Sequence, residues 1–121
     1  MHLPESWLAL TSLAVLCGAI IVGATTAYVR LSDKNTPFDI GILHGRAGIF
    51  GTMLLILSIV IGSESADTIK PVIALLILTI SGGVALYFII RRKGILPKSI
   101  IAIHGAFAVS AVYTLLFGLP F

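Results

Sequence analysis

Two histidines in an otherwise apolar sequence are the residues best suited to do chemistry. His44 lies in "FDIGILHGRAGIF" and His104 in "KSIIAIHGAFAVS", and a glycine follows each of them. An ionisable ring inside a membrane segment is costly, so a histidine in such a segment usually has a functional role. We therefore expect His44 and His104 to bind a metal or a cofactor.

The residues around the two rings narrow the choice of metal. Zinc and copper normally recruit further ligands, but no carboxylate or second thiol shares the depth expected for the histidines. An iron porphyrin needs less from the protein, because its own nitrogens fill the equatorial plane and leave two axial positions for imidazole. The pair thus predicts one haem b with His44 and His104 as its metal ligands.

The two histidine segments are related by an offset of sixty positions. Pro37 and Pro97 each precede their histidine by seven residues, and Asp39 and Ser99 follow as matching candidates for helix N-caps. The sequence therefore predicts a helical hairpin that is repeated in parallel, with pseudo-repeats at about 1–60 and 61–121.

The composition identifies the elements that must carry these histidines. The chain has 121 residues, of which 58% are hydrophobic and 11% charged, and its mean hydropathy is +1.11. Four apolar runs, at about 7–28, 40–61, 71–90 and 100–120, approach the ~20 residues that a helix needs to cross a bilayer. We expect an all-α fold: a single transmembrane domain over 1–121, built as an up-down four-helix bundle in the lipid bilayer.

Helix geometry predicts that the two rings face each other. Each histidine stands five residues past its candidate cap, which is about 7–8 Å along a helix, so both rings share one depth. The second and fourth helices of an up-down bundle occupy opposite corners. Small residues on the histidine faces should then line a cofactor cavity: Gly48, Gly51, Ala108 and Ala111. Glycines on the other two helices make further room: Gly18, Gly23, Gly82 and Gly83.

The basic residues predict the orientation in the membrane. One of the eight, Lys70, lies on the side of the turn at 62–70; the others lie on the opposite side: Arg30, Lys34, Arg46, Arg91, Arg92, Lys93 and Lys98. The positive-inside rule then places the 31–39 and 91–98 loops in the cytoplasm and both termini outside. We expect a bacterial cytoplasmic (inner) membrane, with the histidine end toward the cytoplasm.

The same basic residues bear on ligands. Arg30 and Arg91 stand near the membrane face, where they can neutralise haem propionates, whereas Arg46 should leave its helix on a different face from His44. A nucleic-acid partner is not expected, because the chain has hardly any solvated surface to carry a basic patch.

In these features the chain resembles small four-helix membrane cytochromes of the b type, and it is similar to the haem-bearing membrane anchors of respiratory dehydrogenases. The resemblance rests on His44, His104 and the glycines that follow them. It implies a haem that relays single electrons, often to or from quinone, in a chain that joins other membrane subunits or a second copy. No flavin, nucleotide or iron–sulfur motif is present, so an electron-transfer subunit is expected rather than a complete enzyme.

Two alternatives stay open. The "HGR" at His44–Arg46 resembles the pigment-binding helices of light-harvesting proteins, in which histidine ligates chlorophyll magnesium, although Gly41 stands where those helices carry a glutamate. In the other alternative, the histidines are neutral, hydrogen-bonded contacts between helices. The chain would then be a cofactor-free accessory subunit of a membrane assembly.

Overall fold

A computed structural model describes residues 3–32, 34, 38–94 and 97–118. This part of the chain forms four helices and no strand: α1 (Trp7–Leu31), α2 (Phe38–Val60), α3 (Ala66–Lys93) and α4 (Lys98–Phe117). All four helices are long and apolar enough to cross a membrane. The prediction of an all-α membrane bundle with four spans is confirmed.

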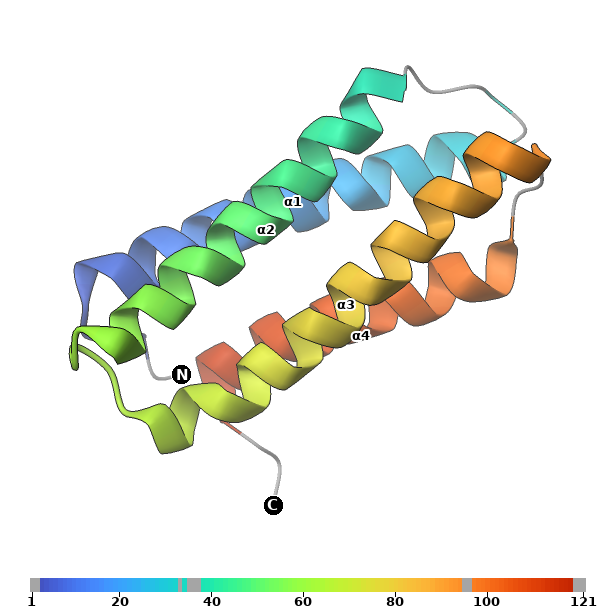
Figure 1. Ribbon diagram of the computed structural model, residues 1–121. Helices are drawn as coiled ribbons and strands as arrows, with labels where there is room; N and C mark the ends of the chain where they lie inside the picture. The colour runs from blue at the N-terminus through green and yellow to red at the C-terminus, as the bar shows by residue number, and fades with distance from the viewer. Residues whose placement is uncertain (1–2, 33, 35–37, 95–96, 119–121) are drawn as a thin grey trace.

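The helices run up and down in two hairpins (Figure 1). Within each hairpin the helices pack closely, α1 against α2 and α3 against α4, while the α1–α4 and α2–α3 sides are looser. The backbones of α2 and α4 are not in contact, so these two helices occupy opposite corners of the bundle, as predicted. In Figure 1 the start of α1, the end of α4 and the α2–α3 turn lie at one end of the bundle, and the ends of α1 and α3 lie at the other.

The helix starts differ from the sequence prediction. The α4 helix begins at Lys98, so Ser99 is its second residue, and the N-cap is Pro97, which makes no side-chain cap bond. Proline already has a φ suited to a helix start, here −79°, and the chain therefore enters the helix two residues earlier than predicted. Asp39 is likewise the second residue of α2, and its side chain lies outside the described residues.

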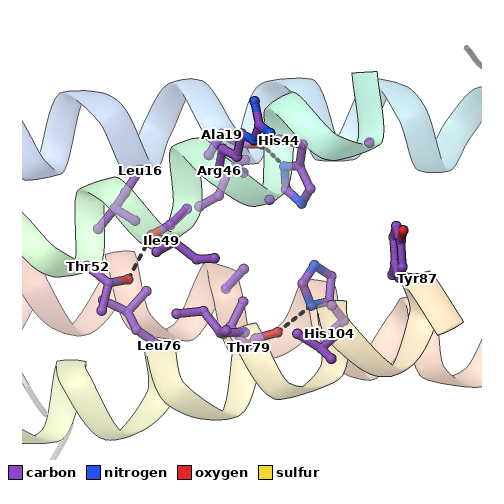
Figure 2. Close-up of a pocket in the computed structure, with 18 of the residues that line it drawn as sticks. Leu16, Ala19, His44, Arg46, Ile49, Thr52, Leu76, Thr79, Tyr87 and His104 are labelled. Carbon is purple, nitrogen blue, oxygen red and sulfur yellow. Dashed lines mark hydrogen bonds between the residues drawn. The ribbon is translucent and has the colours of Figure 1, made fainter. Parts of the chain in front are cut away.

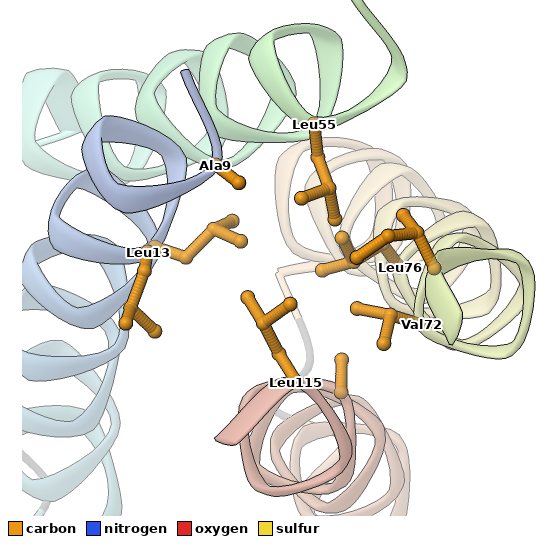
Figure 3. Close-up of a cluster of buried hydrophobic side chains, with 9 residues drawn as sticks. Ala9, Leu13, Leu55, Val72, Leu76 and Leu115 are labelled. Atoms are coloured by element: carbon orange, nitrogen blue, oxygen red, sulfur yellow. The ribbon is translucent and has the colours of Figure 1, made fainter. Parts of the chain in front are cut away.

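The packed core lies toward the end of the bundle that holds the α2–α3 turn. It contains these buried side chains: Ala9, Leu13, Leu16, Leu55, Ile69, Val72, Leu76, Ala111 and Leu115. Figure 3 shows residues from all four helices converging there. The sixty-residue offset recurs among the buried positions, since Leu16 and Leu76 are both buried, as are Leu55 and Leu115. The two hairpins thus contribute equivalent positions to one core.

Candidate functional site

The two histidine rings meet between the hairpins, on the open side of the core. His44 extends from α2 and His104 from α4, and the rings point toward each other (Figure 2). Their centroids are 5.9 Å apart and their planes cross at 83°. Both residues are partly buried. Equal depth and opposite corners, as deduced from the sequence, therefore bring the two imidazoles together.

Each ring is hydrogen-bonded to the backbone of the other helix in its own hairpin. His44 Nδ1 lies 2.8 Å from the carbonyl oxygen of Ala19 on α1, and His104 Nδ1 lies 2.8 Å from that of Thr79 on α3. A carbonyl can only accept, so Nδ1 carries the proton in both bonds. In the neutral ring Nε2 then keeps its lone pair, which is the form of histidine that ligates metals.

A glycine lies against each ring. A Cβ at Gly23 would stand 2.6 Å from His44 Cε1, and a Cβ at Gly83 would stand 3.2 Å from His104 Cε1. These two glycines are themselves sixty residues apart, as are Ala19 and Thr79. The same arrangement of carbonyl, glycine and histidine ring is therefore built twice.

Two cavities adjoin the rings, and both histidines line both of them. The larger, about 380 Å³, extends toward the core, where Leu16 and Leu76 form part of its wall. The smaller, about 250 Å³, reaches toward the end of α1, where Arg30 lines it. Most of the wall is aliphatic or glycine, so the space suits an apolar group larger than a metal ion.

Of the four small residues predicted to line the cavity, two do so and two lie elsewhere. Gly48 lines the larger cavity and Ala108 lines both. Gly51 and Ala111 do not line either, because the helices have already converged at their level. Gly51 packs against α1, where its carbonyl accepts a 2.6 Å bond from Ser12 Oγ. Ala111 is fully buried in the core.

Of the two basic residues predicted to face the ligand, only one lines a cavity. Arg30 lines the smaller cavity, whereas Arg91 lines neither and donates from Nη1 to Tyr87 Oη at 2.7 Å. Tyr87, also on α3, lines both cavities. Arg46 contributes to the wall of the larger cavity, but its side chain runs away from the gap between the rings (Figure 2).

Sequence reasoning missed the two carbonyls that orient the rings. A carbonyl is present on every residue, so Ala19 and Thr79 carry no signature of that role. The available signal was the pair Gly23 and Gly83, which share the sixty-residue offset of the histidines. The sequence indicated only that these glycines make room.

The donor set restricts what the site can hold. Among the described residues there is no group of three or more His, Cys, Asp or Glu side chains that could hold a metal ion. A metal bound here would need most of its ligands from another source. Two facing imidazoles beside an apolar cavity suit a metal that arrives inside an organic macrocycle.

Comparison with known proteins adds no assignment: no family model, no curated protein and no solved structure matches this chain.

Proposed function

We propose that this chain is a membrane b-type cytochrome, which holds one haem b between His44 and His104 and relays single electrons within a larger redox complex. The observation that carries the proposal is the facing pair of rings, each with Nδ1 engaged by a carbonyl and Nε2 left for a ligand bond. The membrane bundle supports it, because such a pair in lipid needs a compensating role.

The spacing of the rings agrees with this proposal. A bond between a metal and an imidazole nitrogen is about 2 Å long, and the centre of the ring lies about 1 Å beyond that nitrogen. Two rings on opposite sides of one metal therefore have centres roughly 6 Å apart. The observed separation of the His44 and His104 centroids is 5.9 Å. The match between the two separations supports one metal shared by the two rings.

The cavities on either side of the histidines offer space for the rest of the macrocycle. Ala108 and Gly83 line both cavities, and their small size leaves space beside the rings. Arg30, at the smaller cavity, is placed to pair with a carboxylate at the rim of the ligand. Haem with two imidazole ligands would supply one-electron exchange at a closed coordination site, which disfavours oxygen binding.

The proposal includes partners and location. The described residues are almost all helix, and a chain of this size has little surface on which a soluble electron donor could dock. We infer association with other membrane subunits or with a second copy, and exchange with quinone is compatible with the role. The basic residues favour a bacterial inner membrane, with the histidine end on the cytoplasmic side.

The first test is a visible spectrum of the full chain purified in mild detergent from haem-replete cells. Reduction with dithionite should give sharp low-spin b-type bands, and any partner subunit should co-purify. His44→Ala and His104→Ala should each retain less than about a tenth of the haem, because losing even an outer-shell partner costs 10–100-fold in affinity. His2→Ala, which removes the third histidine, is the matched control and should keep the full spectrum.

Other spectra would contradict the proposal. A colourless protein from these cells would exclude haem as the ligand. If the colourless chain co-purified stoichiometrically with other subunits, the accessory-subunit alternative would be favoured. A red absorption band of the chlorophyll type would favour the pigment alternative instead.

A further inference from the structure

We propose that Gly23 and Gly83 are positioning residues: each keeps a backbone carbonyl accessible, so that a histidine ring is held with Nε2 facing the gap. The proposal rests on the proposed function where it concerns haem. The orientation of the rings is a property of the chain alone and can be measured without any ligand.

Helix geometry explains why a glycine is needed at these positions. The carbonyl of residue i in an α-helix accepts the N–H of residue i+4 and has one more lone pair to offer. The Cβ of residue i+4 leans toward the helix N-terminus, over that same carbonyl. Gly23 is the i+4 residue of Ala19, and Gly83 is that of Thr79. The absent Cβ opens the carbonyl to a ring from the neighbouring helix.

The space at the two glycines is already filled by the rings. At Gly23 a Cβ would meet Cε1, Nδ1 and Nε2 of His44 at 2.6, 3.0 and 3.2 Å. At Gly83 it would meet His104 Cε1 at 3.2 Å, with Nδ1 at 3.7 Å and Nε2 at 4.0 Å. Alanine at 23 must therefore displace the His44 ring, whereas alanine at 83 needs a shift of only a few tenths of an ångström.

Displacing a ring changes its chemistry as well as its place. The bond from Nδ1 to the carbonyl fixes which ring nitrogen carries the proton, and it makes the other nitrogen a better ligand. A His44 ring without its bond to Ala19 is free to adopt either tautomer and to turn about its side-chain torsions. The Nε2 lone pair is then no longer fixed toward His104.

The test measures the tautomers in the full-length apo protein. A His2→Asn background with ¹⁵N-labelled histidine, reconstituted in lipid nanodiscs, leaves two residues whose protonated and bare ring nitrogens resonate separately. Both should show protonated Nδ1 and bare Nε2. Gly23→Ala should release His44 into a mixture while His104 keeps its signals, and Gly83→Ala should produce a smaller change confined to His104.

Two neighbouring glycines provide matched controls. A Cβ at Gly82 would lie 3.4 Å from His104 Cβ, an ordinary contact, and one at Gly18 would meet nothing within 4 Å. Gly82→Ala and Gly18→Ala should therefore leave both tautomers unchanged. Should Gly23→Ala fail to fold, the milder Gly83→Ala keeps the test available.

Haem titration of the same variants separates the two proposals. We expect Gly23→Ala to weaken haem binding roughly 10–100-fold, and Gly83→Ala to weaken it less. If no variant binds haem but Gly23→Ala still releases His44, the positioning role stands and the proposed function fails. If haem binds with unchanged affinity and the His44 tautomer stays fixed in Gly23→Ala, the positioning role is overturned and the proposed function stands.

Discussion

At Gly51, a Cβ would stand 2.9 Å from both Cγ and Cδ2 of Leu16, so here the missing side chain permits the approach of α1 and α2. The carbonyl of Gly51 also accepts the buried bond from Ser12. This differs from Gly23, where the missing Cβ makes room for a ring. Residues of one type thus serve packing in the core and orientation in the site.

Replacing Gly51 with alanine should destabilise the bundle by about 1–3 kcal/mol, the usual range for overpacking, because Leu16 Cγ is close to the α1 backbone and cannot easily move aside. Equilibrium unfolding in mixed micelles would measure it. Gly45→Ala on the same helix is the control, since a Cβ there meets nothing within 4 Å. Equal stability of the two variants would show that the α1–α2 contact is not tight at Gly51.

At the scale of elements, the helix ends are held in different ways. Ser6, the N-cap of α1, accepts the Ala9 N–H through Oγ at 3.1 Å. Ser65, the N-cap of α3, makes no such bond, and Gly94 ends α3 with a left-handed φ of 62°. The Ser6 N–H also donates to Glu64 Oε1 at 2.9 Å. The α1 start is therefore held by two side-chain bonds, whereas Ser65 supplies none at the α3 start.

Ser6→Ala should lower the free energy of unfolding by about 0.5–2 kcal/mol, the range for losing an N-cap bond. Ser65→Ala, with no cap bond to lose, should be close to wild type. The same unfolding assay compares the two variants. Matching losses would mean that the Ser6 cap adds nothing specific to α1.

At the scale of the whole molecule, the bundle has one packed end and one open end. The core lies toward the α2–α3 turn, whereas the histidines and cavities lie toward the connections after α1 and α3. Basic residues gather at the open end, with Arg30 in the last turn of α1 and Arg91, Arg92 and Lys93 in the last turn of α3. A ligand in the site would therefore lie closer to the basic end of the bundle than to the packed end.

Reporter fusions test which end of the bundle faces the cytoplasm. A fluorescent protein fused after Lys93 should fold in the cytoplasm and fluoresce, and alkaline phosphatase fused after Phe121 should be active outside, because the basic residues are retained on the cytoplasmic side. Exchanging the reporters between the two positions is the control and should abolish both signals. Fluorescence from a reporter after Phe121 would reverse the proposed orientation.

The four helices and the pairing of His44 with His104 could be predicted from the amino-acid sequence alone. Hydropathy is a local property, and it marks the apolar middle of each span, although it misses polar ends such as 66–70 of α3. The shared offset then fixes depth, because rise per residue is constant along a helix. These steps need no knowledge of how the helices pack.

The residues around the rings could be predicted from the sequence only in part. Gly51 and Ala111 share the histidine faces in sequence, yet they lie in the core because the helices converge within two turns of the rings. The carbonyls of Ala19 and Thr79 became hydrogen-bond partners because a glycine one turn later makes room for a histidine ring from the neighbouring helix. Convergence and backbone access depend on packing between helices, which no single helix encodes.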